Sequence, residues 1–303
     1  MPKFGHQHSW QYSVEEALED PSSTHFWLPG RMINAPTETR FNTKEIRGLK
    51  QPGDTDKRRI DDVVVSKNEY PFSLTYIPLK RTSAPKYDMR HFHNMAMNAS
   101  SASTVDGAWT YGTSLTTAIN SFTIFKEIDT IQKQIRGCKI SRLTSRSSLD
   151  NPVEITVEGL GSFATFADLS RTDASTLRDG TPFMWSDVQI YLDGALATFC
   201  TAYEYTINNN AQSNHVLGDR DPKRIDEIGR TVELTITRQF NDTAQYADAK
   251  NGMAKSVTIR FDDTADIDIG FRDCKFASHP ESGENDGILT HQLRLNAETM
   301  FTS

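Results

Sequence analysis

Apolar and polar residues alternate along much of the chain with the two-residue period of half-buried β-strands. In the first half, this alternation predicts strands over 63–79, 121–125, 132–141 and 153–159. In the second half, it predicts strands over 188–192, 197–207, 230–240, 256–262, 268–276 and 289–295. Asp150-Asn151-Pro152 and Asp193-Gly194 are turn signals between such runs. The pattern therefore predicts a mainly β protein.

Few segments have helical spacing. Ser13-Val14-Glu15-Glu16 fits a capping box and predicts a short helix over 14–18. Residues 87–97 and 242–250 predict two more short helices, the second closed by Asn251-Gly252. Polar or Pro- and Gly-rich stretches at 26–60, 100–117 and 208–227 predict loops, and 162–180 is predicted to be a connector.

The chain contains the same arrangement twice. Asp56–Asp62 is echoed by Asp221–Glu227, and Arg136–Ser141 is echoed by Arg272–Ala277. The interval between these motifs is 29 positions longer in the first copy, mostly between residues 81 and 120. We therefore expect a first domain over 1–161 with an extra loop at about 81–120, a connector over 162–180 and a second domain over 181–303.

Composition limits the class of protein. A chain of 303 residues is long enough for two domains. Its 37% hydrophobic share is low, which is typical either of disorder or of a thin fold covered by its neighbours. The regular strands favour the thin fold. A net charge of -7 disfavours wrapping of nucleic acid, and it is compatible with a surface that does not stick to DNA or with ordinary solubility.

The cysteines do not predict a disulfide framework. Cys138, Cys200 and Cys274 are an odd number without a CxxC pair, so we expect small buried residues in a reducing compartment. No apolar run predicts an export signal or a membrane span.

No motif predicts catalysis, a cofactor or a metal. His91-Phe92-His93 has two imidazoles, but no third ligand lies nearby and the segment reads as a helix. The acidic cluster at 262–268 lacks the glycine and the late glutamate of a calcium loop, so a solvated turn is the better interpretation. Nucleophile-elbow, zinc-protease, phosphate-loop and dinucleotide motifs do not occur.

Two polar loops of mixed charge hold corresponding places in the two copies, over 50–62 and 212–227. A solvated loop is the simpler interpretation. The functional interpretation is an inter-subunit docking loop, because mixed charges at equivalent places suit head-to-tail contacts. The candidate docking residues are Asp54, Asp56, Lys57, Arg58, Arg59, Asp219, Arg220, Asp221, Lys223 and Arg224.

An ordered series of short patterns carries a family resemblance. In the second half it comprises Asp193-Gly194, Glu204–Asn210, Leu217–Ile225, Gly229–Thr237, Phe240-Asn241-Asp242 and Tyr246. In the first half, Gly137–Leu143 and Val153–Val157 form the weaker copy. Together they resemble the tail tube proteins of tailed bacterial and archaeal viruses.

The resemblance implies two tandem tail-tube-like β-sandwich or barrel domains, each with a short flanking helix and a long polar loop. It implies a structural virion protein that self-assembles into stacked rings, the conduit for DNA ejection. A duplicated chain would form trimeric pseudo-sixfold rings, with hexamers as the alternative. Implied partners are other copies, the tail terminator, the tail tip or baseplate and the tape measure protein; DNA would pass without specific binding, and no membrane insertion is expected. Such a tail is assembled in the host cytoplasm.

Two other classes of function remain open from the sequence. One is a tandem β-sandwich module at a tail tip that binds carbohydrate or a host receptor, with Trp109 and Tyr111 as its aromatic candidates. The other is a hydrolase whose site is assembled in space. The absence of a catalytic motif favours the structural protein.

Overall fold

The structure is a computed structural model that describes most of the chain. The described residues are 10–17, 20–21, 26–27, 30–35, 37–46, 62–80, 90–97, 109–112, 120–128, 131–168, 180–239, 253–261, 267–278, 281–282 and 290–302. They are mainly β-strand, which confirms the fold class indicated by the alternating pattern.

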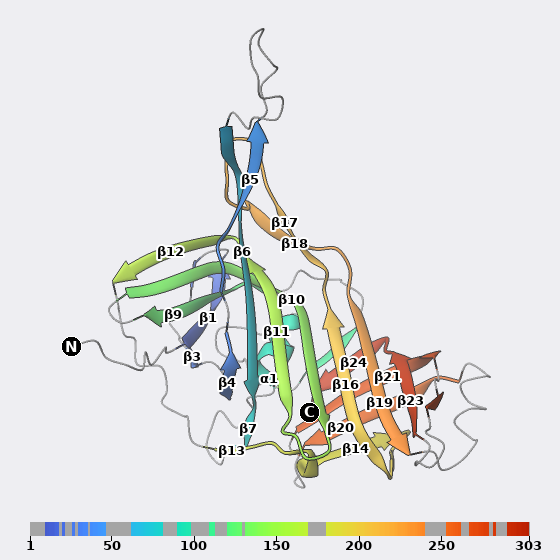
Figure 1. Cartoon of the computed structure of the whole chain (residues 1–303). Helices are drawn as coiled ribbons and strands as arrows, with labels where there is room; N and C mark the ends of the chain where they lie inside the picture. Colours follow the sequence, from blue (N-terminus) through green and yellow to red (C-terminus); the bar gives the residue numbers. More distant parts are fainter. Residues whose placement is uncertain are drawn as a thin grey trace, which may run out of the picture.

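One antiparallel sheet, here called the central sheet, contains strands from both halves of the chain (Figure 1). In spatial order its strands are β4 (Arg31–Asn34), β6 (Asp62–Ile77), β11 (Glu154–Gly161), β10 (Ile131–Ser148), β16 (Cys200–Asn208), β19 (Thr231–Gln239), β23 (Thr290–Asn296) and β21 (Ile267–Ser278). Pairing between β10 and β16 makes the sheet continuous from one half to the other.

Two side sheets complete the architecture. The first contains, in order, β3 (Phe26–Trp27), β1 (Trp10–Ala17), β9 (Phe122–Ile128), β10 and β12 (Phe163–Asp168). The second contains β15 (Ala195–Leu196), β14 (Val188–Leu192), β20 (Lys255–Phe261), β21, β24 (Thr299–Thr302) and β8 (Trp109–Gly112). Except for the added β8, the two side sheets have the same order of pairing.

The remaining elements are short or lie at the margins. They are β2 (Asp20–Pro21), β5 (Arg40–Ile46), β7 (Leu79–Lys80), α1 (Arg90–Ala96), β13 (Thr181–Pro182), the 3-10 helix Trp185–Asp187, β17 (Ala211–Asn214), β18 (Arg224–Glu227) and β22 (Glu281–Ser282). Strand β5 pairs with β6, β17 pairs with β18, and β22 extends the edge of the central sheet beside β23.

Strands β10 and β21 each belong to two sheets because both bend midway. Gly137 (φ 62°) and Asp273 (φ 54°) adopt the left-handed conformation at these bends. Each is followed by a fully buried free cysteine, Cys138 or Cys274, as the sequence predicts. The repeated motif around the two cysteines thus marks the same bend in both halves.

Irregularities in strand pairing also recur at corresponding places. Register shifts separate Ile140 from Arg142 and Phe276 from Ser278, on strands β10 and β21. Shifts between Met32 and Asn34 and between Cys200 and Ala202 interrupt β4 and β16 in the same way. Because bulges are specific features of a strand pair, their recurrence shows that the pairing pattern occurs twice.

A single hydrophobic core contains side chains of all three sheets and of α1. In α1, the buried ring of Phe92 lies 5.4 Å from that of Tyr12 and 6.0 Å from that of Phe122, measured between centroids. The helix predicted over 87–97 is therefore confirmed, and it covers the core. His91 and His93 are buried here and form hydrogen bonds with tyrosine hydroxyl groups.

The helix predicted over 14–18 is wrong, because residues 14–17 lie in β1. The side chain of Glu15, within the predicted capping box, accepts hydrogen bonds from Thr123 Oγ1 and from the backbone N–H of Gly137, both at 2.7 Å. Pairing with β9 and this buried contact at the β10 bend outweigh the local capping signal.

Three other stretches differ from expectation. The region 26–60, expected to be loop, contains β3, β4 and β5, and the polar stretch 208–227 contains the β17–β18 hairpin. The expected connector 162–180 begins with strand β12, which pairs with β10. The helix predicted over 242–250, the loop 50–59 and most of the extra loop 81–120 lie outside the described residues.

The close approach of β6, β10 and β11 requires glycine at position 159. A Cβ atom there would lie 2.2 Å from the carbonyl oxygen of Lys139 and 2.4 Å from the ring of Phe72. We expect Gly159→Ala to lower the free energy of unfolding by about 1–3 kcal/mol through overpacking. Gly229→Ala is the matched control, because a Cβ at Gly229 meets no atom within 4 Å. Equal urea midpoints for the two variants would contradict this account.

Candidate assembly surface

The second predicted docking loop is the β17–β18 hairpin, which lies beside the long β5–β6 hairpin that projects from the body (Figure 1). At its turn, Asp219, Arg220, Lys223 and Arg224 are exposed, and Asp221 is half-buried. The strands β17 and β18 hold this turn at one end of the central sheet. The structure thus brings the five predicted residues of the second loop together.

Asp221 contacts the first half of the same chain. Its Oδ1 accepts hydrogen bonds from Asn68 Nδ2 at 2.8 Å and from the Tyr70 hydroxyl at 2.5 Å. The backbone N–H of Asn68 also donates to the carbonyl of Arg220 at 2.8 Å. Burial, the hydrogen bond to Asp221 and the negative charge of Asp221 together raise the pKa of Tyr70. Asp221 therefore fastens the hairpin to β6.

The corresponding residues of the first loop, Asp54, Asp56, Lys57, Arg58 and Arg59, lie outside the described residues. The strands that flank this loop, β5 and β6, are described and pair from Arg40–Glu69 to Ile46–Asp62. The ends of β5 and β6 that flank this loop lie at the same end of the molecule as the β17–β18 hairpin (Figure 1).

The tip of the β17–β18 hairpin is hydrophobic, a feature that sequence reasoning missed. Leu217 is fully exposed and Val216 is half-exposed, and Gly218 (φ 90°) follows them. An isolated Val-Leu pair within a polar stretch was the available signal. Two adjacent exposed apolar side chains at this tip make it a candidate contact surface.

One face of the central sheet packs on the core, and the opposite face is polar. Thr75, Thr156, Thr144 and Thr206 lie side by side on four neighbouring strands of this polar face. Their hydroxyl oxygens approach to 3.2 Å in the pairs Thr75–Thr156 and Thr144–Thr206. A continuous row of small polar side chains makes this face even across the boundary between the halves.

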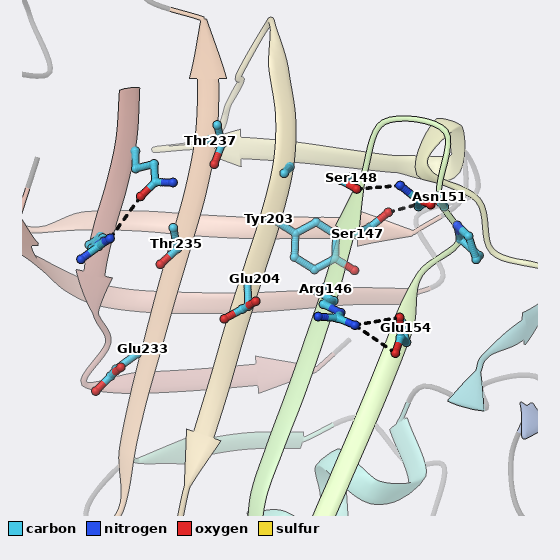
Figure 2. Close-up of a pocket in the computed structure, with 14 residues that line it drawn as sticks. Arg146, Ser147, Ser148, Asn151, Glu154, Tyr203, Glu204, Glu233, Thr235 and Thr237 are labelled. Carbon is cyan, nitrogen blue, oxygen red and sulfur yellow. Dashed lines mark hydrogen bonds and ion pairs between the residues drawn. The ribbon is translucent and has the colours of Figure 1, made fainter. Parts of the chain in front are cut away.

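A groove crosses the same face over β11, β10, β16, β19 and β23 (Figure 2). Arg146 Nη2 lies 3.2 Å from both carboxylate oxygens of Glu154. Glu204 and Glu233 lie on the neighbouring strands and point toward solvent (Figure 2). The groove thus mixes acidic and basic groups, and it offers no cluster of nucleophile and base.

The boundary between the halves is a ladder rather than a loose contact. Seven residue pairs join β10 to β16, from Arg142–Asn208 to Ser148–Ala202. Buried Asn209 extends this junction by donating to the carbonyls of Ala96 at 2.9 Å and Ile140 at 3.0 Å. His93 Nε2 lies 2.6 Å from the Tyr205 hydroxyl, and Lys139 pairs with Glu227 at 2.9 Å. Backbone, amide and ionic contacts therefore hold the two halves together.

The central sheet has an open edge at each end. Among the described residues, β4 pairs only with β6, and β22 and the last part of β21 pair only with β23. Along the first edge, Ile33 and Phe41 are more than half exposed. Open strand edges with exposed apolar side chains favour pairing with another chain.

The structure also places residues of the acidic cluster and of the aromatic pair that the sequence singled out. Asp268 of the acidic cluster pairs with Arg260 at 2.9 Å, and Trp109 and Tyr111 lie in β8 beside β24. Within the described part of the chain, no three His, Cys, Asp or Glu residues are grouped to hold a metal, and no helix has the length and apolarity to cross a membrane.

Comparison with known proteins gives one family. The family model described as phage tail tube protein matches residues 71–298, which is most of the chain and includes strands of both halves. No curated protein matches.

The contact of Asp221 with β6 predicts the behaviour of a single variant. Asp221→Asn keeps the size of the side chain but removes the charge, so we expect a loss of about 1–3 kcal/mol in the free energy of unfolding. The pKa of Tyr70 should fall, yet stay above its ordinary value because burial is its largest cause. Chemical denaturation and a tyrosinate titration measure both effects.

Lys223→Ala is the control for this variant, because Lys223 is exposed and lies in the same turn. It should change neither the stability nor the Tyr70 titration. An Asp221→Asn protein with the stability of the control would show that the hairpin does not depend on this contact.

Proposed function

Because the chain belongs to the phage tail tube protein family, a family of structural proteins of the virion tail, we propose that its copies form stacked rings. These rings would build the tube through which viral DNA passes into the host. The observation that carries this proposal is the β10–β16 ladder, which joins two similar sets of strands into one sheet and leaves an open edge at each end.

We further infer that each chain supplies two tube domains, over 1–161 and 181–303 with a connector between them. The recurring pairing order, bends and bulges support this division. Six tube domains then require three chains, so a trimeric pseudo-sixfold ring is favoured over a hexamer. A rotation that closes fixes the number of chains in the ring, and stacking that does not close builds the tube.

The polar face of the central sheet suits the lumen. The core and the side sheets occupy the other face and need more room, which a position outside the ring provides. The lumen face would carry the threonine row. It would also carry acidic side chains such as Glu204 and Glu233 and basic side chains such as Arg146. Small polar side chains of nearly balanced charge give DNA no basic surface to bind.

The projecting hairpins suit contacts between rings. The tip of β17–β18 carries exposed Leu217, and Asp219, Arg220, Lys223 and Arg224 of the same hairpin are also exposed. Asp221 is already engaged within the chain, so it would position the hairpin rather than meet a neighbour. Tail terminator, tail tip or baseplate and tape measure protein are the further partners, and assembly would take place in the host cytoplasm.

The ring itself is tested on purified protein. We expect electron microscopy to show annular particles and tubes, and native mass spectrometry of single rings to give three chains. Six chains in a ring would contradict the division into two tube domains. A protein that stays monomeric at all concentrations would contradict the tube function.

The role of the hairpin tip is tested at Leu217. Because this side chain is fully exposed, Leu217→Asp should leave the free energy of unfolding within about 0.5 kcal/mol of that of the unsubstituted protein. We expect the variant to form rings but not tubes, as seen by sedimentation and electron microscopy. Leu217→Met is the control and should keep tube formation. Tubes of normal length from Leu217→Asp would exclude the tip from ring stacking.

A further inference from the structure

The two open edges of the central sheet correspond to the two strands that pair inside the chain. Strand β4 has the place of β16. Strand β4 pairs with β6 as β16 pairs with β19, and both pairs have a bulge at the same position. Strand β21 with β22 has the place of β10, since β10 and β21 both bend directly before a cysteine and pair with the next strand through the same bulge. The chain therefore displays both partners of a junction that it already contains.

The correspondence can be followed residue by residue. On the β10 side, the pairs Lys139–Leu160 and Ser145–Ile155 match Lys275–Asn296 and Glu281–His291, displaced by the same interval. Ser278 thus corresponds to Arg142, and Glu281 corresponds to Ser145.

The β16 side gives an equally definite match. The pairs Asn208–Thr231 and Ala202–Thr237 match Arg40–Glu69 and Asn34–Thr75, again displaced by one interval on each strand. The bridge Thr37–Phe72 fills the gap between β4 and β5, where Tyr205 pairs with Leu234. Residues 31–35 and 37–40 therefore lie along one edge that corresponds to β16.

We propose that, in the ring inferred above, the edge that contains Thr37, Glu38 and Arg40 of one copy pairs antiparallel with the edge that contains Ser278 and Glu281 of the next copy, in the register of the β10–β16 ladder. In that ladder Arg142 lies opposite Asn208 and Ser145 lies opposite Tyr205. Between copies, Ser278 then lies opposite Arg40, and Glu281 lies opposite Thr37. The proposal rests on the ring assembly and adds its partner strands and their register.

The state of the free edge fits a second copy as its occupant. Ile33 is more than half exposed on the edge, whereas Thr201 at the corresponding place on β16 is partly covered. Arg40 and Glu38 form an ion pair in which both side chains are more than half exposed. A copy of β21–β22 matches this edge, because its counterpart β10 already pairs in that way with β16, the counterpart of the edge.

Cysteine pairs test the register directly. Directly opposite residues of an antiparallel pair have Cα atoms about 4.5–5.5 Å apart, within the range that a disulfide spans. We expect the double variant Thr37→Cys with Glu281→Cys to assemble under reducing conditions and, on oxidation, to give covalent dimers and closed trimers on a non-reducing gel. Arg40→Cys with Ser278→Cys is a second pair that should behave alike.

The matched control is Thr37→Cys with Ser278→Cys, which moves one partner by three residues, or about 10 Å along the strand. It should give less than a tenth of the cross-linked product. All cysteine variants carry Cys200→Ser, because Cys200 is a free thiol that is only partly buried, whereas Cys138 and Cys274 are buried. The Cys200→Ser protein supplies the background. A mixture of the single variants Thr37→Cys and Glu281→Cys should give cross-linked dimers that neither gives alone, which places the bond between chains.

The outcomes separate the register from the proposed function. Tubes that form without a cross-link in either in-register pair, or that cross-link only in the shifted control, would overturn the register and leave the tube function standing. Covalent dimers from Thr37→Cys alone would show that two β4 edges pair with each other and would also overturn it. A protein that forms neither tubes nor cross-links would overturn both.

Discussion

The structure depends on backbone pairing across one boundary, that between β10 and β16. A sheet edge presents unpaired backbone N–H and C=O groups. At this boundary the groups of β10 form hydrogen bonds with those of β16, because each half supplies an edge strand in the matching register. Asn209, His93 and Lys139 add side-chain contacts around the same ladder. The low hydrophobic share of the chain is consistent with this arrangement, since stability that a larger core would supply comes partly from shared sheet edges.

The same constraint links the local features of the fold to the proposed assembly. The bends at Gly137 and Asp273 let one strand serve both a side sheet and the central sheet, so that the core lies on one side and the polar face stays open. The buried carboxylate of Glu15 holds the first bend by accepting the Gly137 N–H. At the far end of the central sheet, Asp221 ties the β17–β18 hairpin to β6. The proposed assembly would use these three properties together: a closed core, an even polar face and fixed projecting hairpins.

Much of this fold could be predicted from the sequence, and the failures have physical causes. Alternating apolar and polar residues predict strands such as β10, β11, β16 and β19. The repeated motif around Cys138 and Cys274 marks equivalent bends. The capping signal at Ser13 failed because a capping box reflects local sequence only. The carboxylate of Glu15 instead accepts a hydrogen bond from the N–H of Gly137, more than a hundred positions away. The hairpin in the polar stretch 208–227 was missed because its strands β17 and β18 are short and carry few apolar residues. The candidate docking residues were proposed from charge, but charge alone could not separate Asp221, which contacts its own chain, from its exposed neighbours.

Hydrogen–deuterium exchange tests the shared-edge account most directly, because it reads the backbone amides on which the account depends. In the monomer, peptides that cover residues 200–208 should be protected and peptides that cover residues 31–42 should exchange rapidly, although the two segments hold corresponding places. In assembled tubes, both should be protected to a similar degree. Unchanged exchange of residues 31–42 on assembly would contradict the claim that a neighbouring chain completes the sheet at this edge.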